Sequence, residues 1–352
     1  MKSYVIVKAG SVNAYVQFAH LGARVPVLAV PGYSRMILGV LLKWSKDHRQ
    51  ELNSVRDSSI QIFAHIPKTA GSTLVQVMRR QFKPDEILSY EDRLWAINVG
   101  DFLDRAAAGL TGIRCVMGHI PFGVHHDMGV DVKYVTMLRD PVEWTLSMFS
   151  YIKERHGRLP DDVRYPQRAA FADVLQMTLD EFVEFLSNTG MANFQTRYIS
   201  GNLDLRNPLP PHDKLPPNAL DLAKANLFAS CTTFGLVEHF DLSLLLFKNK
   251  LGWKNIHYQS ANVTERRMAR AQVPAAALDR IKELHGDDAQ LYAMATNAFL
   301  ESLAQTGLDR PFVLRRFRAE NAGYGLACRG LGRLRRLAAR TFDALGLPRP
   351  GG

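Results

Sequence analysis

The chain has 352 residues, of which 47% are hydrophobic and 22% charged, and its formal net charge is +10. This composition is ordinary for a globular protein and argues against disorder, collagen-like repeats and coiled coil over most of the chain. Ten arginines and two acidic residues lie in residues 310–352, so this segment carries +8 and residues 1–309 carry only +2. The charge therefore favours an anionic partner, but it predicts no nucleic-acid-binding face across the whole body.

The cysteine and hydropathy patterns argue against two further classes of protein. Cys115, Cys231 and Cys328 are odd in number, far apart and without CxxC spacing, which favours free thiols over a disulfide scaffold or a zinc site. The longest apolar run near the N-terminus, Met36 to Leu42, has seven residues, whereas a membrane-spanning helix needs about 20. Residues 1–20 contain no recognisable secretion signal. We expect a cytoplasmic protein, or one peripheral to a membrane.

The predicted elements divide the chain into three parts. Residues 1–57 mix short apolar runs with glycine and proline, and we expect an N-terminal appendage that packs on the main domain. Residues 58–309 have an α/β pattern, and residues 310–352 form a basic, partly helical tail. The strands predicted in the α/β part lie at 60–66, 113–117, 133–138 and 232–237. Its predicted helices lie at 72–82, 141–156, 178–186, 241–252 and 275–303, the last interrupted near Gly286.

The first segment with recognisable chemistry is HIPKTAGSTL, residues 65–74. A loop that leaves a strand and opens a helix directs backbone N–H groups to one place, where the helix dipole adds positive charge. Lys68 adds a full charge, and Gly71 lets the backbone approach an anion closely. Because Lys68 precedes Gly71, the segment is not a Walker A loop. It predicts a phosphate cradle, although an ordinary surface loop remains the alternative. The residues expected to hold the phosphate are Lys68, Thr69, Ala70, Gly71, Ser72 and Thr73.

The second segment is YVTMLRDPVEWTLS, residues 134–147. Arg139 ends a strand, and Asp140 followed by proline begins a helix. An arginine fork suits a phosphate dianion, and Ser147, two turns into the helix, can add a hydrogen bond. The alternative is that Arg139 pairs with Asp140 or Glu143 while Ser147 only packs.

Taken together, PKTAGSTL and LRDPVEWTLSMF, about seventy residues apart, resemble the signature of sulfotransferases that use PAPS (3′-phosphoadenosine 5′-phosphosulfate). HIPKTAGST with LRDPVE is most similar to the carbohydrate branch related to heparan sulfate 2-O-sulfotransferase. Weaker similarity continues in GHIPFG (118–123), NFQTRYISG (193–201) and FGLVE (234–238), so the resemblance spans about residues 58–300. It implies the sulfotransferase fold, a P-loop-NTPase-like parallel sheet flanked by helices. It also implies PAPS as donor, PAP as product, and no metal.

The resemblance also implies roles for individual residues. The first segment would hold the 5′-phosphosulfate and the second the 3′-phosphate, with Lys68 stabilising the leaving phosphate. His119 follows a strand end and is the expected base for the acceptor hydroxyl, with His125 and His126 as rivals. The acceptor is expected to be a carbohydrate or a similar molecule.

Acceptor recognition is less well defined by the sequence. Arg197 either orients an anionic acceptor, contacts the cofactor, or forms a salt bridge on a helix surface. His125 is a second candidate for binding the acceptor. Asp287 and Asp288 are interpreted as the start of a helix and not as a catalytic pair.

The tail is predicted to contain a basic amphipathic helix over residues 329–345. The apolar residues of one face are Leu331, Leu334, Ala338, Phe342 and Leu345. Such a helix binds an anionic membrane surface or a partner, or it docks on the protein itself. Glycines at 323, 325, 330 and 332 favour a mobile join to the body.

Two other functions remain open at this stage. A P-loop-like nucleotide kinase would need ATP with magnesium, which the position of Lys68 disfavours. A non-catalytic protein that binds anionic glycan or membrane would depend on the tail alone.

Overall fold

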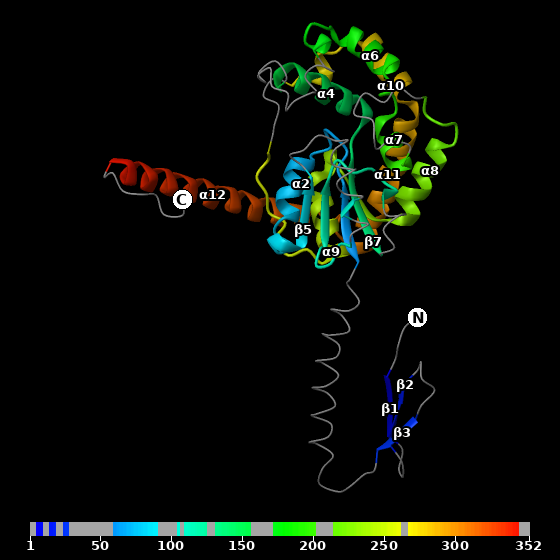
Figure 1. Ribbon diagram of the computed structural model, residues 1–352, viewed down its shortest axis with the longest axis vertical. Coiled ribbons are helices and arrows are strands. Elements are labelled where there is room, and N and C mark those ends of the chain that lie inside the picture. Colours follow the sequence, from blue (N-terminus) through cyan, green and yellow to red (C-terminus); the bar gives the residue numbers. More distant parts are fainter. Residues whose placement is uncertain are drawn as a thin grey trace. The chain divides into compact units, whose positions relative to one another are not determined.

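The structure is a computed structural model of residues 1–352 (Figure 1). It describes residues 5–9, 14–18, 24–27, 59–90, 104–105, 109–124, 131–155, 172–201, 214–261 and 267–344. Residues 5–27 are described by their strands alone, and Arg155 and residues 331–344 by their backbone alone.

The chain divides into two compact units, residues 1–58 and residues 59–352. The first unit contains three antiparallel strands in the order β1-β2-β3: β1 (Val5–Ala9), β2 (Ala14–Phe18) and β3 (Arg24–Val27).

The second unit is built on a five-stranded parallel sheet of order β5-β6-β4-β7-β8. Its strands are β4 (Ile60–Ala64), β5 (Ile87–Tyr90), β6 (Cys115–Gly118), β7 (Val132–Leu138) and β8 (Cys231–Leu236). The predicted α/β class with a parallel sheet flanked by helices is confirmed. The sequence analysis missed β5, whose four residues alternate between buried and half-buried positions.

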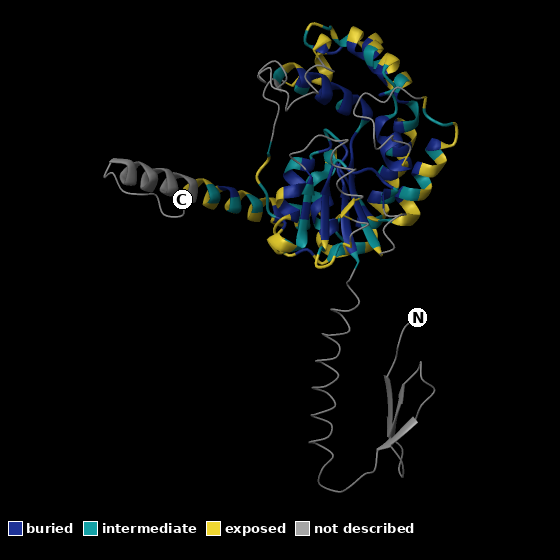
Figure 2. Cartoon of the chain, in the orientation of Figure 1, coloured by how far each residue is buried: buried dark blue, intermediate teal, exposed yellow. Residues whose placement is uncertain are grey.

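Both faces of the sheet are covered, as the continuous burial of its central strand requires (Figure 2). On one face, Phe63 of β4 packs in a cluster with side chains of helices α2, α9 and α12. On the other, Ile62 packs in a larger cluster that includes side chains of α4, α6, α7, α8 and α11. A third cluster joins α4 and α6 to α10. The helices are α2 (Gly71–Met78), α4 (Pro141–Arg155), α6 (Leu179–Asn188), α7 (Phe194–Ser200), α8 (Ala219–Ala225), α9 (Phe240–Leu251), α10 (Ala275–Leu284), α11 (Gly286–Thr306) and α12 (Pro311–Ala344). Short helical turns lie at Pro84–Glu86, Asp173–Leu175, Asn226–Ser230, Val237–His239 and Arg270–Gln272.

Local sequence signals place several helix ends where they were predicted. The Asp140 carboxylate accepts a hydrogen bond from the backbone N–H of Glu143 at 3.0 Å and so caps α4. Thr178 and Glu181 form a capping box at the start of α6, where the helix was predicted to begin. The predicted interruption near Gly286 separates α10 from α11 at His285.

The C-terminal segment departs from its prediction. Gly323, Gly325 and Gly330 lie inside one continuous helix, α12, so the expected mobile join at the glycines is wrong. The inner face of this helix is docked on the second unit, because Phe317 is buried beside α9 and Tyr258 donates its backbone N–H to Asn321. None of the described helices combines the length and apolar character that crossing a bilayer requires.

The sheet order creates a switch point between β4 and β7. The chain leaves β4 toward β5 at one edge and leaves β7 toward β8 at the other. In open α/β sheets, ligands bind in the crevice at the carboxyl ends of two such strands. Here these ends carry the loop 65–71 and Arg139, the two segments that the sequence analysis singled out.

Candidate functional site

The loop after β4 has a backbone shape that side chains rarely permit. Lys68 and Ala70 both have left-handed φ angles, 67° and 61°, on either side of the fully buried Thr69. Left-handed backbone costs roughly 1–2 kcal/mol for each such residue. Successive left- and right-handed residues turn neighbouring N–H groups to one side and form a concave site for an anion. The strain therefore lies at the place where an anion-binding function is expected.

Helix α2 opens directly from this loop. Its N-cap residue is Ala70, whose side chain cannot accept a hydrogen bond from the first turn. The N-terminus of α2 therefore keeps its partial positive charge without a capping carboxylate or hydroxyl. Such an end suits a phosphate or sulfate group.

Gly71 is required for a reason that the sequence analysis did not foresee. A Cβ at this position would overlap the imidazole ring of His65. The glycine thus makes room for a buried histidine at the end of β4, whatever it also does for a bound anion. The His65 ring consequently lies against the first turn of α2.

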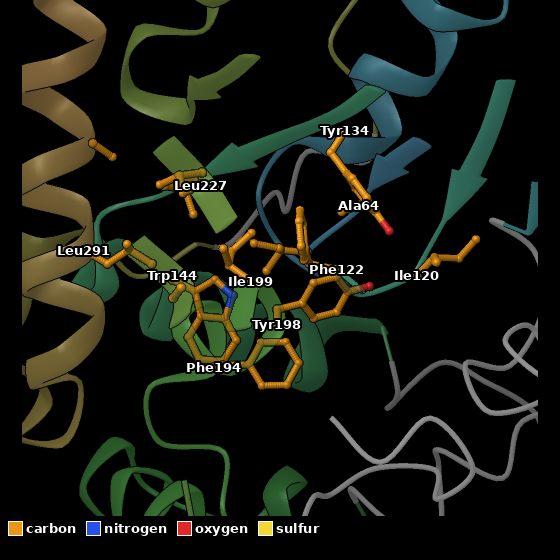
Figure 3. Packing of buried hydrophobic residues seen from close by; sticks show 14 of the residues in the cluster. Ala64, Ile120, Phe122, Tyr134, Trp144, Phe194, Tyr198, Ile199, Leu227 and Leu291 are labelled. Carbon is orange, nitrogen blue, oxygen red and sulfur yellow. The ribbon is translucent and has the colours of Figure 1, made fainter. Parts of the chain in front are cut away.

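Two side chains from the second segment hydrogen-bond to the loop, one from the end of β7 and one from α4. Arg139 donates a hydrogen bond from Nη1 to the Lys68 carbonyl oxygen at 2.8 Å. Trp144, one turn into α4, donates from Nε1 to the Pro67 carbonyl oxygen at 2.8 Å. The Trp144 ring is fully buried and stacks on Phe194 with 5.3 Å between centroids (Figure 3). The two sequence motifs are therefore in direct contact.

Arg139 is a buried cation with one ion-pair partner at the edge of contact distance. Its Nε lies 4.0 Å from Glu238 Oε1, and this Nε makes no hydrogen bond within the described part of the chain. Burial lowers the pKa of Arg139 to about 10, so the group stays charged at neutral pH. A buried, incompletely paired arginine at a switch point is a candidate for binding an anion.

The alternative pairing considered for Arg139 is wrong. Asp140 lies 3.6 Å from Arg270 and caps α4. Glu143 pairs with Arg267. Both acids thus have other cationic partners, and the partner of Arg139 is Glu238.

The Lys68 side chain lies over helix α4. Its Nζ is 3.8 Å from the centre of the Tyr151 ring, a cation–π contact. Trp144, Ser147 and Tyr151 are spaced at helical intervals, so they share the face of α4 that is turned to the loop. Ser147 is buried between two residues that contact the loop. It thus lies on the side where the sequence analysis expected it.

His119 lies beside the loop and is held in one tautomer. Its Nδ1 is 2.9 Å from the His65 carbonyl oxygen, which can only accept, so Nδ1 carries the hydrogen. In the neutral ring Nε2 then carries the lone pair. The His119 ring also stacks on His65 at 4.3 Å, and His65 lies against Gly71. The His65 ring therefore lies between the predicted base, His119, and the start of α2.

Not all of the expected hydroxyl donors are turned to an anion. The Thr69 hydroxyl donates to the Ile66 carbonyl oxygen at 2.7 Å, so it stabilises the loop itself. The Thr73 hydroxyl oxygen accepts from the backbone N–H of Ala261 at 3.0 Å. The hydroxyl hydrogen of Thr69 is therefore used within the loop, whereas Thr73 only accepts in its bond and keeps a hydrogen to donate. Ser72 is half-buried in the first turn of α2.

The acceptor-binding candidates have different outcomes. Arg197, a residue of α7, is only 3% exposed and therefore does not lie on the helix surface. His125 and its rival His126 lie outside the described residues. Asp287 and Asp288 occupy the first turn of α11, which confirms that they begin a helix.

Sequence reasoning missed the residue that fixes Arg139. The Gln195 carboxamide bonds both backbone groups of Arg139, from the middle of the NFQTRYISG segment. These two residues are 56 positions apart, so no spacing rule connects them. Tyr151 was missed for another reason, because an aromatic residue in a helix most often belongs to the core.

Neither a metal-ligand cluster nor a disulfide is found among the described residues. No group of three or more histidine, cysteine, aspartate or glutamate side chains able to hold a metal ion occurs within them. All three cysteines are free thiols, as predicted.

Comparison with models of known protein families finds no family that matches this chain. Comparison with curated proteins finds no matching sequence either. The function therefore has to be argued from the motifs and from the site itself.

Proposed function

We propose that the chain is a PAPS-dependent sulfotransferase that acts on a hydroxyl group of a carbohydrate or a similar acceptor. One observation carries the proposal: the strained Lys68 loop and Arg139 meet across the switch point of a parallel sheet and share a hydrogen bond. The resemblance of these two segments to the sulfotransferase signature supplies the identity of the anion. The sulfotransferase fold belongs to the same proposal.

The residues present fit a ligand with two separate anionic groups. The uncapped N-terminus of α2, Ser72 and Lys68 surround one place, and these groups would hold the 5′-phosphosulfate. Arg139, whose guanidinium bonds the Lys68 carbonyl oxygen, and the buried Ser147 of α4 would hold the 3′-phosphate. Bound PAPS supplies a sulfuryl group, whose bond to the phosphate oxygen breaks as its bond to the acceptor oxygen forms.

The chain's own residues would perform two tasks in this transfer. Lys68 would leave the Tyr151 ring and place its ammonium group against the departing phosphate oxygen, where negative charge develops. His119 would accept the proton of the acceptor hydroxyl at Nε2, while its Nδ1–H stays bonded to the His65 carbonyl oxygen. These residues would hold both partners in line and need no metal for either task.

The test begins with binding. PAP at a hundred times its dissociation constant stabilises a folded protein by about 2.7 kcal/mol, so the melting temperature should rise by several degrees. The absence of a rise would contradict the proposal. A rise with ATP and magnesium, but not with PAP, would favour the nucleotide kinase. Radiolabelled PAPS offered with a panel of hydroxyl acceptors then identifies the substrate.

A specific observation favours a second role for the C-terminal helix. The outer face of α12 exposes Phe312 and Leu326, at 56% and 64%, among the exposed arginines 315, 316 and 329. Apolar side chains flanked by cations suit the surface of an anionic membrane. We propose that α12 docks on the protein with one face and attaches it peripherally to a membrane with the other.

A further inference from the structure

The Gln195 carboxamide forms a two-point pair with the backbone of Arg139. The Arg139 N–H donates to Gln195 Oε1 at 2.9 Å, and Gln195 Nε2 donates to the Arg139 carbonyl oxygen at 2.8 Å. Gln195 is only 2% exposed. The ladder between β7 and β8 ends at Leu138, so the glutamine serves Arg139 as a neighbouring strand would.

The helix that carries Gln195 is itself fixed by charge at its N-terminus. α7 has only seven residues, which is too short to be stable alone. The buried Asp288 carboxylate accepts the backbone N–H groups of Gln195 and Thr196, at 3.1 Å and 2.6 Å. In return, Asn193 Oδ1 accepts the N–H groups of Asp287 and Asp288 at the start of α11. Each helix therefore caps the other, and these bonds fix the position of the helix that carries Gln195.

Arg139, which Gln195 holds, is in turn bonded to the anion-binding loop. The Arg139 side chain donates to the carbonyl oxygen of Lys68, a residue held in left-handed backbone. The direction of this side chain depends on the Arg139 backbone, and Gln195 occupies both hydrogen-bonding groups of that backbone.

We infer that Gln195 is a positioning residue for the anion-binding loop: it fixes the Arg139 backbone, and thereby the guanidinium that holds Lys68. This inference rests on the proposed function. Gln195 does not itself contact the ligand, so its contribution to ligand affinity should pass through Arg139. That dependence distinguishes it from a residue that only stabilises the fold.

The experiment is a double-mutant cycle on PAP affinity. Gln195→Ala should weaken PAP binding about ten-fold in the wild-type background. In the Arg139→Lys background, which keeps a cation but loses the guanidinium, the same substitution should change PAP affinity less than two-fold. Gln195→Met, which fills the volume without hydrogen bonds, should match Gln195→Ala and serves as the readout if the alanine variant does not fold. Gln195→Glu keeps the acceptor for the Arg139 N–H and should recover part of the affinity.

Asn226→Ala is the matched control. Asn226 Nδ2 bonds the carbonyl oxygen of Ile199, so it also joins an amide side chain to the backbone, but at the far end of α7. Its loss should lower the melting temperature and leave PAP affinity unchanged. Equal losses for Gln195→Ala in both backgrounds, or no loss in either, would overturn the inference and leave the proposed function standing. A wild-type protein that binds no PAP would overturn both.

Discussion

Gly71 lies directly against the His65 ring at the end of β4, so a larger residue at position 71 conflicts with that ring. Gly71→Ala places a methyl group inside the His65 ring. Forcing extra atoms into a packed site costs about 1–3 kcal/mol, so we expect a clear fall in the melting temperature. In a His65→Ala background the same substitution should cost much less. Gly286→Ala is the control, because a Cβ there meets nothing within 4 Å.

His119 is the residue whose loss should separate chemistry from binding. His119→Ala removes the lone pair at Nε2 but no group expected to hold a phosphate. We expect turnover with PAPS to fall about a hundred-fold or more, with little change in PAP affinity. His239→Ala is a matched control, because the His239 ring stacks on Phe299 at 6.0 Å and is assigned no part in the site. Unchanged turnover in His119→Ala would move the base to another residue, with His125 and His126 the first to examine.

At the scale of elements, the contact between α7 and α11 contains two buried groups with opposite pKa shifts. Burial raises the pKa of Asp288 from 3.8 to about 6 and lowers the pKa of His285 from 6.5 to about 4. The Asp288 contribution to stability therefore falls as the pH rises from about 4 to 6. The His285 contribution rises over nearly the same range. The two largely cancel in the wild-type protein.

Single substitutions should reveal the two opposing pH dependences of stability separately. With Asp288→Asn only the His285 contribution remains, so stability should fall as the pH is lowered from 6.5 to 4. Two pKa units correspond to about 3 kcal/mol. His285→Gln should behave in the opposite sense and gain stability over the same acidification. Melting temperatures between pH 4 and 7 measure both. Parallel curves for the two variants would show that the shifts are not linked to folding.

Helices with local signals were predicted from the sequence, and elements fixed by distant contacts were not. The capping box at Thr178 and the cap at Asp140 each lie within one turn of the helix they begin. β5 has no such signal, because its four residues become a strand only by pairing with β6. The Gln195 amide and the Arg139 backbone likewise meet only through the fold. The loop motif was visible because its residues are consecutive, whereas the residues that hold it come from the end of β7 and from α4.

At the scale of the whole molecule, the inner face of α12 is an integral part of the second unit. Phe317 is 3% exposed, and the His257 ring stacks near both Phe317 and Tyr324. Phe317→Ala should therefore destabilise the protein by about 3–5 kcal/mol, measured by denaturant unfolding. Phe312→Ala is the control on the same helix, because that side chain is 56% exposed. A similar loss in both variants would contradict the assignment of the two faces.

Truncation after Gly330 removes the distal part of α12 and the residues after it. It tests how much this segment contributes to the proposed membrane binding. Residues 331–352 carry five arginines and one aspartate, while the docking residues Phe317, Asn321 and Tyr324 are retained. Basic residues near an anionic membrane contribute about 1 kcal/mol each, so the loss of five arginines should weaken sedimentation with phosphatidylserine vesicles. The retained Phe312, Leu326 and Arg315 should keep part of it. Neither protein should sediment with phosphatidylcholine vesicles. Melting temperature and PAP affinity should stay unchanged, because no described contact of the site involves residues beyond 330. Absence of sedimentation of the full-length chain would contradict the membrane role, and undiminished sedimentation of the truncated chain would confine the contact to residues 311–330 of α12. A loss of PAP affinity would extend the functional domain into the tail.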